Sequence, residues 1–223
     1  MLTTKNSIHL PAILNKIMQN EVAKILLETN AVKLSPDNPF TWSSGWKSPI
    51  YCDNRTLLSF PAERDLVKKS LASAIAEKYP QADVIIGVAT AGIAIGALVA
   101  DEMGLSYAYC RPKPKEHGLK KQLEGRVAEG SKIVVMEDLI STGGSSLKVV
   151  EFLRSEGFEV VGLAAIFSYG FAIADQNFEE ANCEKLVLSD YNQLLGQATS
   201  SGYINSNQIE ALEEWRRAPQ DWG

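Results

Sequence analysis

The chain has 223 residues, of which 45% are hydrophobic and 22% are charged, and its formal net charge at pH 7 is −5. This length and composition fit one substantial globular domain, and the negative charge disfavours a dedicated nucleic-acid-binding protein. No apolar run approaches the roughly 20 residues that cross a bilayer, and residues 1–10 lack the basic-then-apolar pattern of a signal peptide. The three cysteines form no C-x-x-C pair, so neither a disulfide framework nor a zinc site is indicated. We therefore expect a cytoplasmic protein without membrane or nucleic-acid partners.

The first 80 residues predict two helices separated by an irregular segment. Apolar residues recur at helical spacing over 14–26 and over 61–79, where Pro61 suits the first helical turn. Between these helices lie the turn-forming residues 35–39 and an aromatic, glycine-containing stretch at 40–53 with short β-like pieces. We expect this part of the chain to form a small N-terminal capping subdomain, or hood.

From residue 81 onward, short apolar runs alternate with helical patterns. We expect strands at 84–88, 106–110, 133–136, 160–167 and 185–188, with helices at 93–103 and 145–155. Near-continuous Val, Ile and Leu runs are typical of strands buried on both faces. The pattern predicts an α/β fold: an open doubly wound, mainly parallel five-stranded sheet flanked by helices.

Three parts of one domain follow from these patterns. We expect the hood and its helices at about 1–80, a ligand-binding core at about 81–190 and a C-terminal helical segment at about 191–223. The last 19 residues, 205–223, predict a short amphipathic helix. Ligands of such sheets bind at the carboxyl ends of the strands, so the loops there are the places to look for a site.

The loop after the predicted strand 133–136 combines two acids with small polar residues. Glu137 and Asp138 are followed by Leu139, Ile140, Ser141, Thr142, Gly143, Gly144 and Ser145, and then by a predicted helix. Backbone N–H groups in a glycine-rich turn and at a helix N-terminus can hold a phosphate, while carboxylates suit the hydroxyl groups of a sugar. The alternative from composition alone is a capped helix with two solvated acids.

The whole string 133–145 resembles the motif that binds phosphoribosyl pyrophosphate (PRPP) in the type I phosphoribosyltransferase family. The resemblance implies that residues 137–145 bind PRPP and that Asp138 is a catalytic residue. Neither a P-loop pattern nor a G-x-G-x-x-G pattern is present in the sequence.

The segment 111–121 carries five Lys or Arg residues and one acid, with two prolines and a glycine. This composition predicts a mobile loop, and a solvated charge run or an RNA-binding patch are the alternatives. Cations in such a loop could stabilise a leaving pyrophosphate, and closure could exclude water. The order of residues resembles the catalytic loop of orotate phosphoribosyltransferases, which implies that Arg111, Lys115 and His117 bind PRPP, that Lys115 and His117 are catalytic, and that the loop is shared across a homodimer.

Small residues also follow the predicted strand 84–88. In the resembled family the matching loop holds the pyrophosphate, which implies PRPP binding by Thr90, Ala91 and Gly92 through backbone donors. Close packing of a helix on the sheet would explain these small residues equally well.

The aromatic stretch 40–53 resembles the amino-terminal part of orotate phosphoribosyltransferases. A flat, acidic pyrimidine requires an aromatic wall and positive potential, so Lys47, Tyr51 and Ser141 are predicted to bind orotate. Core packing is the alternative role for Trp42 and Trp46. The chain departs from the enterobacterial form of the family at Ser43, Ala91 and Pro112, where that form has lysines, and around Tyr169, where it has an arginine.

The resemblance therefore implies transfer of the phosphoribosyl group of PRPP to orotate, giving orotidine 5′-monophosphate in pyrimidine (UMP) biosynthesis. Mg²⁺ is the expected cofactor, held mainly by substrate oxygens rather than by protein ligands. A purine phosphoribosyltransferase is the first rival, because it would share the PRPP site. A regulator that only senses PRPP is the second, although the sequence shows no helix-turn-helix pattern.

Overall fold

The computed structural model describes residues 10–42, 45–113 and 122–222, and the side chains from residue 17 onward. Its central feature is a six-stranded sheet with the strand order β10-β9-β8-β5-β6-β7. The strands are β5 (Val84–Val88), β6 (Ser106–Cys110), β7 (Leu123–Glu124), β8 (Lys132–Ile140), β9 (Glu159–Ser168) and β10 (Lys185–Asp190). All neighbouring pairs are parallel except β6 and β7.

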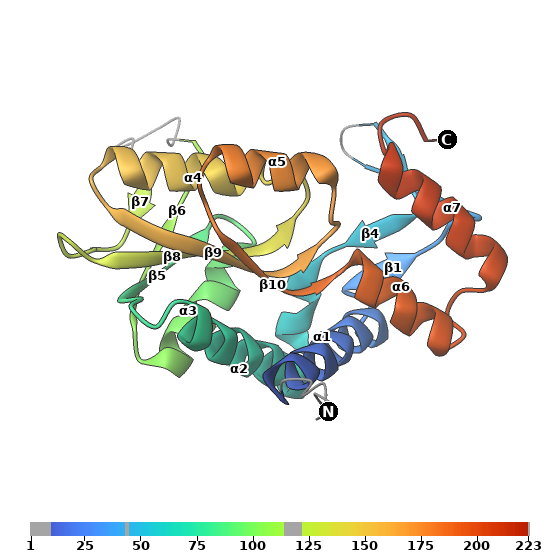
Figure 1. Ribbon diagram of the computed structural model, residues 1–223, viewed down its shortest axis with the longest axis horizontal. Coiled ribbons are helices and arrows are strands. Elements are labelled where there is room, and N and C mark those ends of the chain that lie inside the picture. Colours follow the sequence, from blue (N-terminus) through green and yellow to red (C-terminus); the bar gives the residue numbers. More distant parts are fainter. Residues whose placement is uncertain (1–9, 43–44, 114–121, 223) are drawn as a thin grey trace, which may run out of the picture.

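Helices cover both faces of this sheet (Figure 1). One face packs against α1 (Leu10–Glu28), α2 (Pro61–Lys78) and α3 (Gly92–Met103), and the other against α4 (Gly144–Ser155) and α5 (Ala172–Glu180). The predicted α/β class, the five parallel strands and the two helices predicted between them, which correspond to α3 and α4, are confirmed, whereas α5 was not predicted. The antiparallel edge strand β7 was not predicted, because two residues are too few to show a period.

The buried side chains form two clusters, one on each side of the sheet. Successive residues of one strand alternate between them: Val134 and Met136 belong to the cluster under α2 and α3, whereas Ile133 and Val135 belong to the cluster under α4. This alternation explains why the strands are apolar at every position.

The segment between α1 and α2 forms two small antiparallel ribbons and a 3₁₀ helix, and we call residues 32–60 the hood. Strand β1 (Val32–Leu34) pairs with β4 (Ile50–Cys52), strand β2 (Phe40–Thr41) pairs with β3 (Lys47–Ser48), and η1 spans Asn54–Ser59. The division of the chain into three parts stays a prediction.

The C-terminal segment contains α6 (Tyr191–Ser200) and α7 (Ser206–Arg217), which lie beside β1 and β4 in Figure 1. Helix α7 confirms the predicted amphipathic helix but ends at Arg217. Helix α6 lies within the segment 191–223 that was expected to be helical, although its own bounds were not predicted, and Asp190 and Gln193 form a capping box at its start. None of the helices in the described part of the chain combines the length and the apolar character that spanning a bilayer requires.

Candidate functional site

A cleft opens at the carboxyl end of β5, the strand on whose two sides the chain places β6 and β8. From β5 the chain runs through α3 to β6 on one side, while β8 pairs with β5 on the other side. This is the switch point at which doubly wound sheets bind ligands. The cleft is lined by the loop after β5, the end of β8 and the start of α4, through Val88, Ala89, Thr90, Ala91, Glu137, Asp138, Leu139, Ser141, Thr142, Gly143, Gly144, Ser145 and Ser146.

The loop after β5 lies directly against the end of β8. A β-carbon on Gly92 would lie 2.5 Å from the carbonyl oxygen of Met136, so only glycine fits at this position. The peptide bond between Ala89 and Thr90 is cis. The loop that was predicted to hold an anion is therefore brought next to the acidic strand end.

The Glu137 side chain is 6% exposed and points toward α4. Its Oε2 accepts a hydrogen bond of 2.9 Å from Ser146 Oγ, and its Oε1 accepts one of 3.0 Å from the backbone N–H of Asp138. Burial, and then the charge of Asp138, raise the pKa of the Glu137 carboxyl. Both oxygens thus have protein donors, and Glu137 holds the strand end and the first turn of α4 together.

Asp138 lies on the opposite face of β8 and lines both the cleft and a second, largely apolar cavity under α3. Its backbone carbonyl oxygen accepts a hydrogen bond of 2.8 Å from Asn54 Nδ2 in the hood. Burial raises the pKa of its carboxyl, and the positive charge of Arg55 is among the influences that lower it. The hood is thereby attached to the residue that faces the cleft.

The turn at residues 141–143 leads into α4 and exposes the helix N-terminus to the cleft. Gly143 has a φ of 80°, and a β-carbon there would lie 2.5 Å from Phe178 Cε2, so conformation and space both require glycine. Asn177 Nδ2 on α5 donates to the carbonyl oxygen of Thr142 at 2.9 Å. A braced helix N-terminus of this kind is a ready site for a phosphate group.

Comparison with known proteins identifies the family. Residues 54–194 match the model of the phosphoribosyl transferase domain. The orotate phosphoribosyltransferase of Cytophaga hutchinsonii is 52% identical over 91% of this chain and 97% of its own length, and that of Porphyromonas gingivalis is 50% identical over 93% and 99%. The crystal structure of orotate phosphoribosyltransferase from Aeropyrum pernix superposes with a TM-score of 0.72 at 28% identity, over 82% of this chain and 99% of that one.

The chain belongs to the orotate phosphoribosyltransferase family. Members of this family use PRPP and orotate as substrates, and phosphoribosyltransferases generally use a divalent metal. The described residues contain no group of three or more His, Cys, Asp or Glu that could hold a metal ion.

The structure brings most of the predicted PRPP-binding residues of this orotate phosphoribosyltransferase family member together in one cleft, with three exceptions among those that it describes. Ile140 is fully buried in the core under α4, so its side chain does not reach the cleft, and Gly92 packs against the backbone of Met136 behind the lining. Arg111 follows β6 outside the cleft, and its guanidinium carbon lies 5.8 Å from the centroid of the Tyr109 ring. Lys115 and His117 lie outside the described residues, as does Ser43. The roles assigned to all of these residues stay predictions.

The residues predicted to bind orotate lie on two elements. Lys47 on β3 donates from Nζ to Thr41 Oγ1 at 2.9 Å, and Tyr51 on β4 is 42% exposed. Ser141 lies in the cleft itself. Trp42 packs against the core, whereas Trp46 is 41% exposed, so the core-packing interpretation was right for Trp42 and wrong for Trp46.

An aromatic cluster beside this region was missed in the sequence. Trp42 stacks on Tyr169 with ring centroids 5.6 Å apart, and both rings meet the fully buried Trp215 of α7 edge-on. The C-terminal helix therefore supports the end of β9 and the hood. The only available signal was Trp215 on the apolar side of the predicted tail helix.

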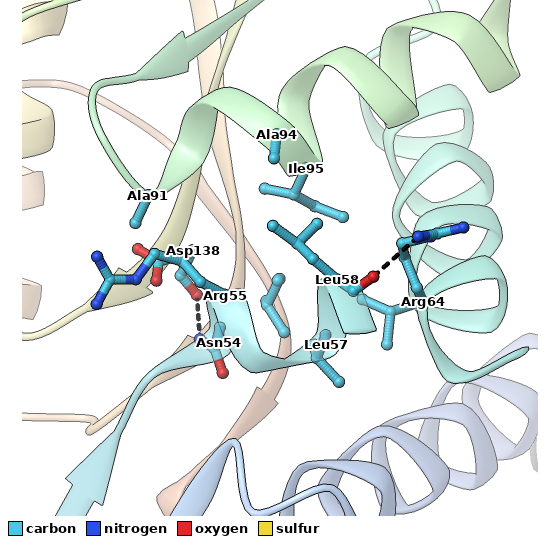
Figure 2. A pocket seen from close by; sticks show the side chains of 11 residues that line it. Asn54, Arg55, Leu57, Leu58, Arg64, Ala91, Ala94, Ile95 and Asp138 are labelled. Carbon is cyan, nitrogen blue, oxygen red and sulfur yellow. Dashed lines mark hydrogen bonds between the residues drawn. The ribbon is translucent and has the colours of Figure 1, made fainter. Parts of the chain in front are cut away.

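The tripeptide Asp53-Asn54-Arg55 was also missed, since the sequence shows these residues only as polar positions after a strand. Figure 2 shows Asn54 and Arg55 beside Asp138, at one end of the cavity under α3. The Arg55 hydrogen bonds to Asp53 lower the pKa of the Asp53 carboxyl. Asn54 connects the hood to the acidic strand end, and Arg55 lines the same cavity as Asp138.

Proposed function

We propose that this chain transfers the 5-phosphoribosyl group of PRPP to orotate, giving orotidine 5′-monophosphate and pyrophosphate in the de novo synthesis of UMP. The observation that carries the proposal is the meeting of an acidic strand end with a braced, amide-rich turn at the switch point of the sheet. One site thus offers acceptors for sugar hydroxyls and donors for a phosphate. The similarity to orotate phosphoribosyltransferases, at 50–52% identity over more than 90% of this chain, favours orotate as the acceptor.

The backbone N–H groups of residues 141–145 and the N-terminus of α4 would hold the 5-phosphate of PRPP. Asp138 would accept hydrogen bonds from the ribose hydroxyls, which fixes the sugar relative to the phosphate. Glu137 remains a predicted second ligand of PRPP, and its bonds to Ser146 and Asp138 position the turn. Holding both ends of the sugar orients its anomeric carbon for attack.

The reaction needs no covalent intermediate with the protein. The N1 nitrogen of orotate forms a bond to the anomeric carbon and gives up its proton to water, while the bond from that carbon to the pyrophosphate oxygen breaks and leaves its electron pair on pyrophosphate. We propose that the loop at Thr90, Ala91 and Gly92, together with Arg111, Lys115 and His117, stabilises the charge that grows on pyrophosphate. Lys47, Tyr51 and Ser141 are proposed to contact orotate.

Mg²⁺ is the proposed cofactor. Asp138 offers a hard carboxylate oxygen at the cleft, and Mg²⁺ commonly combines one or two such ligands with substrate phosphates. When bound, the ion neutralises part of the charge of the pyrophosphate group. We also propose a homodimer in which segment 111–121 serves the partner's site, and a cytoplasmic location, which the three free cysteines favour.

The test is release of pyrophosphate from PRPP and Mg²⁺ in the presence of orotate, adenine, hypoxanthine or uracil, each offered separately. We expect release with orotate only, and we expect Asp138→Asn to reduce it about 10–1000-fold, because a lost charged hydrogen bond costs roughly 1.5–3 kcal/mol and catalytic coupling adds to this. Release with a purine alone would identify the rival transferase. PRPP binding without turnover of any base would favour a sensor.

A further inference from the structure

The cationic side chains that could serve the cleft lie outside its described lining. Among the described residues that line it there are two carboxylates and no lysine or arginine. A pyrophosphate group carries several negative charges, and its departure is favoured by cations placed in advance at the leaving oxygen. Cations that act on pyrophosphate must therefore approach from outside this lining, as is proposed for the segment 111–121, and the hood is a second element that borders the cleft.

Arg55 is placed to be such a cation. It belongs to η1 of the hood and lines the cavity that also contains Ala91 and Asp138, two residues that face the cleft as well. Figure 2 shows its guanidinium directed to the side of Ala91, away from the apolar interior of the cavity. Arg55 thus extends toward the loop that is proposed to hold pyrophosphate.

Two contacts hold Arg55 in this position. Its Nε and Nη2 atoms donate to the two carboxylate oxygens of Asp53 at 2.7 and 2.9 Å. Asn54, the adjacent residue, is fixed to the backbone of Asp138. A guanidinium has five N–H donors, so within the described part of the chain three remain for a ligand, and the side chain is 56% exposed.

The same cavity contains a second arginine that serves as an internal comparison. Arg64 of α2 lies at the opposite end, where its Nη1 donates to the carbonyl oxygen of Leu58 at 2.9 Å. Figure 2 shows Arg64 on the far side of Leu58 from Asp138. Arg64 therefore has the same charged group as Arg55 and lines the same cavity, but it lies at the end of the cavity away from the cleft.

We propose that Arg55 binds the pyrophosphate group of PRPP, as a cation supplied by the hood and oriented by Asp53. This inference rests on the proposed function, since it takes PRPP as the ligand. It gives the hood a role in binding the donor in addition to its proposed role in binding orotate.

The experiment compares four purified variants with the full-length wild type: Arg55→Gln, Arg55→Lys, Asp53→Asn and Arg64→Gln. Calorimetry measures binding of pyrophosphate and of PRPP with Mg²⁺ and without orotate, and steady-state kinetics give the KM values for PRPP and orotate separately. For Arg55→Gln we expect pyrophosphate and PRPP to bind about 10–100-fold more weakly, as for a lost charged hydrogen bond. The KM for orotate should stay within about twofold.

Arg55→Lys should recover part of the loss, because it restores charge without the two-pronged geometry. Asp53→Asn should weaken pyrophosphate binding less than Arg55→Gln, and Arg64→Gln should bind as the wild type does. Unchanged pyrophosphate binding in Arg55→Gln, or an effect confined to the KM for orotate, would overturn the inference. A wild type that binds pyrophosphate through Arg55 but does not use orotate would overturn the proposed function alone.

Discussion

Replacing Gly92 with alanine tests whether the cleft depends on the close approach of the β5 loop to β8. The added β-carbon would lie 2.5 Å from the carbonyl oxygen of Met136 and 3.4 Å from Cα of Glu137. Both neighbours are backbone atoms, so rotation of a side chain cannot relieve the contact. The loop and the strand must move apart by roughly 0.9 Å to reach an ordinary distance of 3.4 Å.

That displacement acts on stability and on activity. Overpacking of this kind typically costs about 1–3 kcal/mol in the free energy of unfolding. A shift of about 1 Å in the groups that orient a substrate can cost about 100-fold in rate. We therefore expect Gly92→Ala to fold with reduced stability and to lower kcat/KM for PRPP about 100-fold.

The assay is pyrophosphate release at saturating orotate with PRPP varied, together with denaturant unfolding of the same preparation. Gly196→Ala is the control, because Gly196 lies in α6 and its added β-carbon would meet no atom within 4 Å. The control should gain about 0.5–1 kcal/mol in stability and keep wild-type kinetics. If Gly92→Ala lost stability but kept kcat/KM within about twofold of the wild type, the close approach would not position the substrate.

Three further predictions concern other parts of the site. Burial, and then the charge of Asp138, raise the pKa of Glu137 to about 8, so the contribution of this carboxyl to stability falls as the pH rises from the ordinary carboxyl pKa of about 4.3 to that raised value. Urea unfolding at several pH values should therefore show Glu137→Gln gaining stability relative to the wild type over this range, and a difference that stays constant with pH would contradict this. Trp215→Ala should lower the free energy of unfolding, measured in urea, by about 3–5 kcal/mol, because it removes the side chain at the centre of the aromatic cluster. A loss below about 1 kcal/mol would show that α7 contributes little to the stability of the fold. Lys115→Ala and Asp138→Asn should each be much less active than the wild type when assayed alone. Random mixing of the two should raise the activity to about one quarter of the wild type if each site combines the two chains of a dimer, whereas no recovery would argue against sharing.

Much of the fold could be predicted because its strands are buried on both faces. Strands such as Val84–Val88 lie between two layers of helices, so every position is apolar and the run is distinct from its surroundings. The short helix α5 buries only Ala174 and Phe178, and that pattern is too sparse to distinguish a helix from a loop. Strand β7 pairs through two residues only. Elements were missed where the hydrophobic period had too few residues to appear.

The site could be predicted to the extent that it is contiguous in the chain. Residues 137–145 form one strand end and one turn, so the sequence alone places their carboxylates beside the amide groups of the turn. Asn54 contacts Asp138 across 84 positions of sequence, and Trp42 meets Trp215 across an even longer interval. Such contacts follow from how α1, the hood and the C-terminal helices pack around the sheet, and no local pattern encodes them.

The different surroundings of Glu137 and Asp138 could also have been predicted from the sequence, because the side chains of a strand alternate between the two faces of the sheet. Neighbouring residues of β8 point to opposite faces of the sheet, so Glu137 continues the row of Ile133 and Val135 toward α4, whereas Asp138 continues the row of Val134 and Met136 toward α3 and the hood. Two adjacent acids at a strand end therefore cannot have equivalent surroundings. The one that faces α4 receives the hydroxyl of Ser146, and the one that faces the hood has Arg55 in the same cavity. This difference is why we assign the ribose to Asp138 and the bracing of the turn to Glu137.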